Sequence, residues 1–289
     1  MNRSSKSLRL LFPQWQGGNN SLYPLGTELL QWLAPDEKGI TERVNVTPIG
    51  QELDIQNGTR ARNELVAQQE KALSILNKQN PDTIVTFGGD CLVSLVPFSW
   101  LNEKYGDKFG ILWIDSHPDV QTSQSFENAH AYVLGNLVGN GDKDFTQFVV
   151  KPVSSKNVLI AGLHNPLPVE EEILKELAIP TVSPKQLKEN QAVIQEWLIA
   201  NKIEYLAIHI DLDVLDSREF RSILFAKPYR TADQFGGVAE GELMIRDVLD
   251  IVKEANQHST VVGLTIAEHL PWDAQNLQKM LEELPLIGR

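Results

Sequence analysis

Short apolar runs alternate with longer amphipathic stretches along most of the chain. Residues 59–79 show the clearest helical pattern, and Thr59, which follows Gly58, is expected to cap this helix. The apolar residues on its one face are Leu65, Val66, Ala72, Leu73 and Leu76. Similar patterns predict helices over residues 27–33, 93–104, 129–139, 170–177, 190–200, 240–256 and 273–284. The apolar runs predict strands over residues 8–12, 44–49, 83–87, 111–114, 157–162, 180–182, 205–210 and 261–266.

This alternation indicates an α/β protein. Short apolar strands separated by helices predict βαβ units, and hence a parallel sheet covered by helices on both faces. The chain has no internal repeat, low-complexity tract or linker, so we expect one domain over residues 1–289. The longest irregular stretch, residues 216–237, follows a strand, and loops of that length are often functional.

Composition and charge narrow the classes of partner. The formal net charge of −12 disfavours nucleic acid or an anionic membrane as the main partner, because both reward basic surfaces. No apolar run approaches the ~20 residues of a membrane helix, and the apolar run at residues 8–12 is too short and too interrupted for a signal peptide. The single cysteine, Cys91, excludes an intrachain disulfide. We therefore expect a cytoplasmic protein.

Three polar residues follow the apolar run at residues 111–114. They are Asp115, His117 and Asp119, and in an extended chain alternate side chains point the same way. Two carboxylates and an imidazole on one face suit a divalent cation. The alternative is an Asp-rich turn in which His117 is only hydrogen-bonded.

Other predicted strands end in similar side chains. Cys91 follows residues 83–87, Asp211 and Asp213 follow residues 205–210, and Glu268 follows residues 261–266. In open α/β sheets, ligands bind at the carboxyl ends of the strands. The three residues after strand 111–114, with Asp211 and Asp213, give five ligands, of which four are carboxylates. This set exceeds one four-coordinate zinc site and suits two metal ions that share carboxylates, with Mn²⁺ preferred over Zn²⁺.

Together these motifs resemble the arginase/agmatinase (ureohydrolase) family. The segments that carry the resemblance, which spans roughly residues 83–270, are Gly88-Gly89-Asp90-Cys91, Asp115-Ser116-His117-Pro118-Asp119, Asn128-Ala129-His130, Asp211-Leu212-Asp213, Gly236-Gly237 and Glu268. The resemblance implies a three-layer α/β/α fold with a mostly parallel sheet and a binuclear Mn²⁺ centre. It also implies a small guanidino substrate, and it suggests trimers or hexamers.

The resemblance assigns metal ligands. Asp115 and Asp211 would bridge the two metals, and Asp119 would complete the first site together with Cys91. His117 and Asp213 would complete the second site.

The same resemblance assigns catalytic roles. A metal-bridging hydroxide would attack the guanidinium carbon, so that a guanidino C–N bond breaks and urea or a urea analogue is released. Asp119 would take a proton from the tetrahedral intermediate, His130 would pass protons to the leaving amine, and Glu268 would bind the guanidinium.

Cys91 is the main departure from the family, most of whose members have His at this position. Three hypotheses about Cys91 follow: it ligates a different or weaker first-site metal, it leaves that site empty, or it is an inert buried thiol. The same change resembles the branch of the family that hydrolyses N-hydroxyarginine and releases hydroxyurea. The function is therefore open between urea release, hydroxyurea release and a family member that binds a metal or guanidino ligand without turnover.

The substrate tail is the second departure. Gln121 stands where arginases usually carry Asn, and we expect it to contact the substrate. Arg221, Lys227 and Arg230 of the long loop offer positive charge to a carboxylate-bearing substrate, or form a solvated loop. Among the other histidines, His209 alternates with the core side of its strand and is expected to be packed.

Overall fold

The computed structural model describes residues 6–36, 39–190, 192–231, 234–286 and 288. The strands of its main sheet are β1 (Ser7–Phe12), β2 (Ile40–Arg43), β5 (Thr83–Gly88), β6 (Phe109–Ile114), β7 (Val158–Ala161), β8 (Thr181–Val182), β9 (Tyr205–Asp211) and β10 (Thr260–Ala267). Their spatial order is β2-β1-β5-β10-β9-β6-β7-β8, and the strand pairs that the described residues form within this sheet are all parallel. A separate antiparallel pair joins β3 (Ile55–Gln56) and β4 (Thr59–Arg60).

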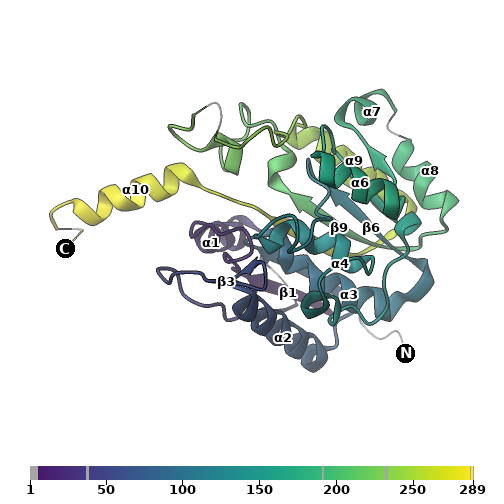
Figure 1. The fold of residues 1–289 in the computed structure, drawn as a ribbon, viewed down its shortest axis with the longest axis horizontal. Coiled ribbons are helices and arrows are strands. Elements are labelled where there is room, and N and C mark those ends of the chain that lie inside the picture. Colours follow the sequence, from purple (N-terminus) through teal and green to yellow (C-terminus); the bar gives the residue numbers. More distant parts are fainter. Residues whose placement is uncertain (1–5, 37–38, 191, 232–233, 287, 289) are drawn as a thin grey trace.

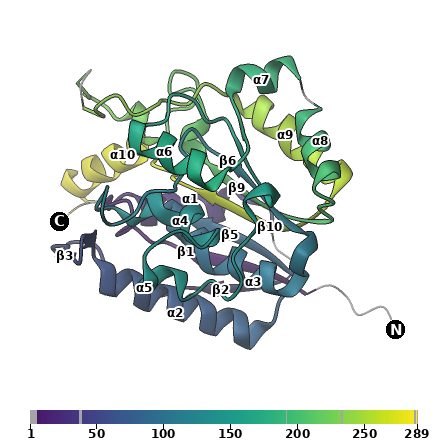
Figure 2. The same ribbon diagram turned by 45° about the vertical axis from the view of Figure 1, so that its right-hand side comes forward.

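Helices connect most of these strands (Figures 1 and 2). They are α1 (Tyr23–Leu33), α2 (Arg62–Gln79), α3 (Leu95–Tyr105), α4 (Val133–Leu137), α5 (Lys143–Thr146), α6 (Pro168–Leu177), α7 (Pro184–Glu189), α8 (Val193–Ala200), α9 (Ile245–His258) and α10 (Trp272–Glu283). Short 3₁₀ turns cover Cys91–Ser94, Gly106–Lys108, Ala129–Tyr132, Ser155–Asn157, Leu212–Val214 and Leu224–Ala226.

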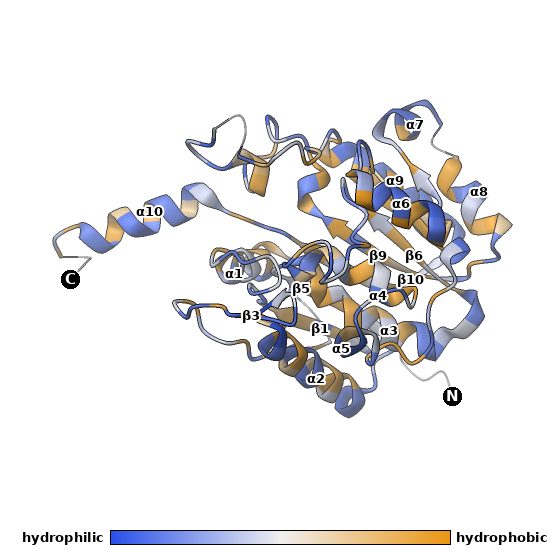
Figure 3. Cartoon of the chain, in the orientation of Figure 1, coloured by the Kyte–Doolittle hydropathy of each residue, from blue (hydrophilic) through white to orange (hydrophobic). Residues whose placement is uncertain are grey.

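The sheet is the middle of three layers. Alternate residues of β6 face opposite sides, so that Ile111 and Trp113 pack in a cluster with residues of α2, α3 and α4. Leu112 and Ile114 pack in a second cluster with residues of α8 and α9. Figure 3 shows apolar residues along the central strands and polar residues on the outer faces of helices such as α2. The predicted three-layer α/β/α fold with a parallel sheet is confirmed.

Helix α10 differs from the others. Figure 1 shows it extending away from the rest of the molecule, and none of its residues is buried. Its apolar residues Leu277 and Met280 are each 51% exposed. In the described part of the chain, no helix combines the length and apolarity that crossing a membrane requires.

Several predicted elements differ from the structure. The prediction of a strand at residues 44–49 is wrong, because the strand at this edge of the sheet is β2, which ends at Arg43. Val44 is buried, and its N–H donates a hydrogen bond to Leu11 O of β1. The predicted cap Thr59 belongs to β4, and α2 begins after Ala61, whose φ of +51° breaks the chain direction. Helix α9 begins at Ile245 rather than at residue 240, because Leu243 first pairs with Leu215. Helix α7 was not predicted, although Ser183 and Gln186 form a capping box at its start.

Helix α1 packs closely on the segment that follows β10. A Cβ built on Gly26 would lie 1.9 Å from the carbonyl oxygen of His269, and the ring Nδ1 of His269 lies 3.0 Å from Gly26 O. Trp15, Leu22, Tyr23 and Leu270 form a small buried cluster at this contact. The start of α1 is therefore held against the end of β10.

Gly26→Ala tests this packing. Helix propensity alone would favour alanine by about 1 kcal/mol, but the added methyl group meets backbone, and overpacking costs roughly 1–3 kcal/mol. We expect the variant to lower the free energy of unfolding by about 2 kcal/mol in urea titrations. Leu33→Ala, at a position of α1 that is 64% exposed, is the control and should change it by less than ~0.5 kcal/mol. A stabilised Gly26→Ala variant would contradict the close packing.

Candidate metal centre

Four neighbouring strands deliver the predicted site residues to one edge of the sheet. The strands are β5, β10, β9 and β6, and the paired residues Phe87, Ile266, Ile210 and Ile114 form one continuous row across them. Cys91, Glu268, Asp211 and Asp115 follow that row within one to four residues. The register of the sheet therefore places these side chains at the same level.

Asp115 lies at the centre of the group and is fully buried. Its Oδ1 accepts a hydrogen bond from His117 N at 2.7 Å, and its Oδ2 accepts one from Trp113 Nε1 at 3.0 Å. The chain bends at residues 115–117 instead of staying extended, and Asp119 has a φ of +48°. The three side chains thus do not share an extended face, but the bend still brings Asp115 and His117 together.

Asp115, His117 and Asp213 form the first of two candidate metal-binding groups. The ligand atoms of the group lie within 4.8 Å of one another. His117 Nδ1 is 3.4 Å from Asp115 Oδ1 and 3.5 Å from Asp213 Oδ2, and its Nε2 lies 2.9 Å from Ala239 O. Burial alone would lower the pKa of His117, but the carboxylates of Asp213 and Asp115 raise it well above its ordinary value.

The second group consists of Cys91, Asp115, His209 and Asp211, again with ligand atoms within 4.8 Å of one another. Cys91 Sγ donates to Asp211 Oδ2 at 2.9 Å. Burial and the charges of Asp211, Asp119 and Asp115 raise the pKa of the Cys91 thiol well above its ordinary value. Cys91 therefore lies among acidic side chains at the candidate centre, and Asp115 belongs to both groups.

His209 was expected to be packed, and its packing is confirmed. The ring stacks on Trp113 with centroids 3.6 Å apart, and Nδ1 lies 2.8 Å from Ser94 Oγ. Burial lowers the pKa of His209 well below its ordinary value, so the ring is neutral. Its place in the second group was not predicted, because an imidazole inside an apolar strand reads as a core residue.

Two buried carboxylate oxygens of this region lack a hydrogen-bond partner among the described residues. They are Asp119 Oδ2 and Asp213 Oδ1. Asp119 lies outside both groups, although its charge acts on Cys91 and its own pKa is raised by burial and by Asp115. A buried carboxylate oxygen without a donor is costly, and a bound cation removes that cost. The residues present therefore fit divalent metal ions.

Glu268 lies beside the second group and is 2% exposed. Its Oε1 is 3.3 Å from His130 Nδ1 and 3.7 Å from Cys91 Sγ, and its Oε2 accepts a hydrogen bond from the hydroxyl of Tyr23. Burial raises the pKa of Glu268 to about 8 and, with the nearby His117, lowers that of His130 to about 4. His130 and Glu268, predicted from separate segments, are thus neighbours.

Gln121 contacts an acidic residue that the sequence did not distinguish. Its Nε2 donates to Glu170 Oε1 at 2.8 Å, and both side chains are buried. The other oxygen of Glu170 accepts from Leu167 N at 2.9 Å, so Glu170 caps α6. Its charge contributes to the raised pKa of Asp119, which places the pair near the candidate centre.

The long loop after β9 reaches the centre through Phe225, whose ring lies 5.9 Å from that of His117. Phe225 also lines a recess of about 280 Å³ with four cationic side chains. These are Arg218, Arg221, Lys227 and Arg230. Arg218 is paired with Asp216 and Arg230 with Glu240.

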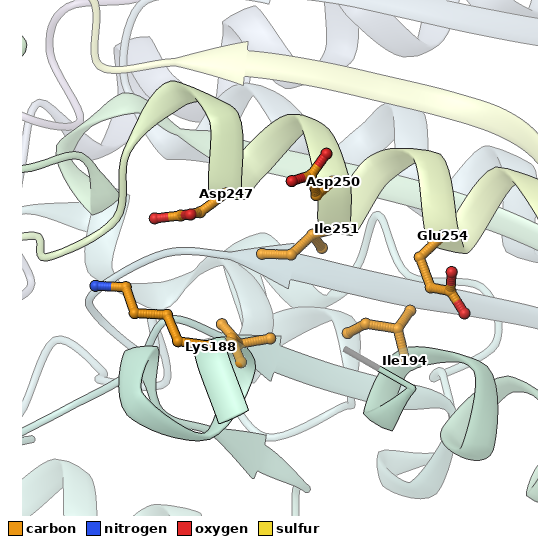
Figure 4. A pocket seen from close by; sticks show the side chains of 7 residues that line it. Lys188, Ile194, Asp247, Asp250, Ile251 and Glu254 are labelled. Carbon is orange, nitrogen blue, oxygen red and sulfur yellow. The ribbon is translucent and has the colours of Figure 1, made fainter. Parts of the chain in front are cut away.

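A different pocket lies between α9 and the segment of α7 and α8. Figure 4 shows Lys188 and Ile194 on one side and Asp247, Ile251 and Glu254 of α9 on the other. It measures only about 40 Å³, and its lining includes none of the predicted site residues. We regard it as a packing gap between helices, since its walls are the outer helical layer.

Comparisons with known proteins agree with this geometry. The sequence model of the arginase family matches residues 28–278. The chain is 26% identical over 197 residues to the arginase of Eremothecium gossypii. The aligned region covers 65% of this chain and 46% of that protein. The chain spans about half the length of the curated relatives it matches.

Solved structures share the fold. The arginase of Entamoeba histolytica in complex with L-ornithine superposes with a TM-score of 0.71 at 19% identity, over 92% of each chain. The formimidoylglutamase of Bacillus subtilis superposes with a TM-score of 0.67 at 14% identity, over 94% of this chain and 81% of the other. At these identities the structures show the fold alone. The family match, however, extends over most of the sequence, and the chain belongs to the arginase family.

Proposed function

We propose that this chain is a metal-dependent amidinohydrolase, which cleaves a guanidino C–N bond and releases urea or a urea analogue. The observation that carries the proposal is the pair of candidate metal-binding groups that share Asp115. Glu268 lies at their side with one oxygen 3.3 Å from His130. A cation-binding carboxylate next to a metal centre suits a substrate with a guanidinium or amidinium head.

The proposed metal ligands overlap with the two groups in part: Asp115 belongs to both, Asp211 only to the second, and Asp119 to neither. Cys91 and Asp119 would help to hold one ion, His117 and Asp213 would help to hold the other, and Asp115 and Asp211 would contribute to both sites. Carboxylate-rich ligation supports Mn²⁺, while the thiol of Cys91 suits a softer ion and weakens one site for Mn²⁺. When bound, such a metal pair would supply a hydroxide nucleophile at neutral pH.

The protein side chains supply binding and proton transfer. Glu268 would hold the guanidinium by a charge-assisted pair. Asp119, with its unpaired buried oxygen, would accept a proton from the attacked intermediate. His130 is neutral because of its lowered pKa, so it can take up a proton and deliver it to the leaving amine.

Substrate identity is the finer part of the proposal. Gln121, held by Glu170, would contact the substrate tail, and the cationic recess beside Phe225 favours a carboxylate-bearing tail. The alternative is N-hydroxyarginine with release of hydroxyurea, and the place of Cys91 among the candidate ligands favours it. A small-molecule substrate, a cytoplasmic location and a homo-oligomeric state stay predictions.

Metal loading and product release test the function together. After Mn²⁺ loading and desalting, we expect about two equivalents of metal per chain, or a mixed pair. The loaded protein should hydrolyse one of arginine, agmatine, guanidinobutyrate, guanidinopropionate, formiminoglutamate and N-hydroxyarginine, with urea, formamide or hydroxyurea as the measured product. Chelation with EDTA should abolish turnover, and Mn²⁺ should restore it.

Three outcomes decide between the alternatives. Less than half an equivalent of metal after loading would end the binuclear proposal. Bound metal with no product from any substrate would favour a family member that binds without turnover. Hydroxyurea release alone would favour the N-hydroxyarginine alternative.

Cys91→His tests whether residue 91 faces a metal. A thiol must lose its proton to bind a metal, and burial with the charges of Asp211, Asp119 and Asp115 raises the pKa of the Cys91 thiol and makes that loss costly at pH 7. An imidazole, with an ordinary pKa of about 6.5, needs a smaller proton displacement. We expect the variant to bind Mn²⁺ about ten-fold more tightly in calorimetric titrations. Cys91→Ser is the control, because it removes the thiol without adding an imidazole, and it should not gain Mn²⁺ affinity. An unchanged Mn²⁺ affinity in Cys91→His would favour an inert buried thiol.

A further inference from the structure

The carboxylate of Glu268 is held from opposite sides. Its Oε1 faces His130 Nδ1 at 3.3 Å and Cys91 Sγ at 3.7 Å. Its Oε2 accepts the hydroxyl hydrogen bond of Tyr23, which lies 245 positions away in sequence. Glu268 also has a φ of +63°, and its N–H donates to Gly89 O at 2.7 Å. Backbone and carboxylate are therefore both constrained.

Tyr23 itself has little freedom. It is the first residue of α1 and is 2% exposed. A Cβ built on Gly18 would lie 2.7 Å from the Tyr23 ring, and a Cβ built on Gly89 would lie 2.9 Å from the Cβ of Tyr23. Two glycines thus leave just enough room for this tyrosine. The backbone contact of Gly26 with His269 fixes α1 relative to the residue after Glu268.

We propose that Tyr23 is a positioning residue that fixes the plane of the Glu268 carboxylate for a guanidinium or amidinium group. The inference rests on the proposed function, in which Glu268 binds that group. The last torsion of a glutamate side chain is broad, so the chain alone does not set the plane of the carboxylate. A two-point contact with a planar cation needs that plane to be set, and a hydrogen bond to one oxygen sets it. The ionised carboxylate has about four acceptor positions, so the tyrosine bond leaves positions for the cation.

The hydroxyl of Tyr23 is the donor that holds Oε2 of Glu268. In an apolar setting such as the Trp15–Leu22–Leu270 cluster, that donor cannot be replaced by bulk water. Tyr23 therefore acts through Glu268 and does not need to touch the substrate.

Tyr23→Phe removes the hydroxyl and keeps the ring. In the metal-loaded full chain, we expect guanidinium chloride at millimolar concentration to bind roughly ten-fold more weakly by calorimetry, because a hydrogen bond to a charged group is lost. For a turned-over substrate, KM should rise by about the same factor and kcat should change less than about two-fold, since the lost contact orients the bound cation throughout the reaction. Metal content should stay at the wild-type level.

A double-mutant cycle shows whether the effect passes through Glu268. In the Glu268→Gln background, Tyr23→Phe should cause no further loss of guanidinium affinity. Tyr105→Phe is the matched control, because its hydroxyl bonds Asp82 O at 2.7 Å at the opposite end of α3 from the centre. It should leave both guanidinium affinity and KM unchanged.

Each outcome decides the inference. An unchanged guanidinium affinity in Tyr23→Phe, or an equal loss in the Glu268→Gln background, would overturn it. If Tyr23→Phe does not fold, Gly18→Ala is the second variant: its added Cβ would lie 2.7 Å from the Tyr23 ring, so it should displace the hydroxyl and weaken guanidinium binding. An unchanged guanidinium affinity in a folded Gly18→Ala would contradict the inference. Binding that depends on Tyr23 without turnover of any substrate would support the inference and end the hydrolase proposal. A wild-type protein that binds no guanidinium would end both.

Discussion

Asp115→Asn is expected to reduce metal content below one equivalent per chain and to lower turnover by at least about 10³-fold. Asp115 is the one residue shared by both candidate metal-binding groups of the described residues. An amide keeps the size of the side chain but removes the charge that two ions would share. Metal ions contribute several kcal/mol to such reactions, and each 1.36 kcal/mol corresponds to ten-fold in rate. Metal analysis after Mn²⁺ loading and steady-state kinetics measure both effects.

Thermal unfolding separates loss of metal from loss of fold. A ligand that binds only the folded state stabilises it by mass action, so Mn²⁺ should raise the Tm of the wild type but not that of Asp115→Asn. Asp216→Asn is the matched control: it removes a nearby carboxylate that pairs with Arg218 instead of joining either group. It should keep the metal content and the Mn²⁺ response. Two retained equivalents in Asp115→Asn, with turnover within ten-fold of wild type, would contradict the shared-ligand role.

The position of the centre could be predicted from the sequence, because it depends on periodicity and burial. The apolar runs before Asp115, Asp211 and Glu268 are central strands, and the ends of parallel strands meet at one edge. The adjacency of the four strands could not be predicted in the same way. The sheet order places β10 and β9 between β5 and β6, so neighbours in space are far apart in the chain. Such an order depends on how the helices cover the two faces, and no local pattern encodes it.

Local sequence patterns could not predict the detailed arrangement of the side chains, for similar reasons. Asp119 and Glu268 have positive φ values of +48° and +63°, which non-glycine residues adopt only when the surroundings impose them. His209 lies inside an apolar strand, and its signal is that of a core residue. The sequence places Glu170 in the charged first turn of a helix, and its side chain does cap α6. It also accepts a hydrogen bond from Gln121, which no local pattern indicates. Tyr23 comes from the start of α1, and long-range packing such as that of Gly26 on His269 holds it near Glu268.

Glu268→Gln is expected to lower kcat/KM by about 10²–10³-fold while making the metal-free protein more stable. The loss in activity follows from removing one partner of a buried charge pair, which costs roughly 2–5 kcal/mol. The gain in stability follows from burial, which raises the pKa of Glu268 from 4.5 to about 8. A carboxyl group whose pKa is raised in the folded state favours folding less and less as pH rises through that interval. Glutamine has no proton to lose, so the variant avoids this decline.

The pH dependence of unfolding tests the second half of the prediction. For the metal-free proteins, the stability of Glu268→Gln relative to wild type should begin to rise near pH 4.5 and stop rising above about pH 8, the two pKa values of the carboxyl group. Urea titrations at several pH values should show a difference of a few kcal/mol at the upper end. Glu127→Gln is the control for activity, because that carboxylate is 41% exposed and pairs with Arg60; it should keep the wild-type kcat/KM. A Glu268→Gln variant that is less stable than wild type at pH 8, or that retains full kcat/KM, would show that Glu268 is a structural residue rather than the binding site of a cationic substrate.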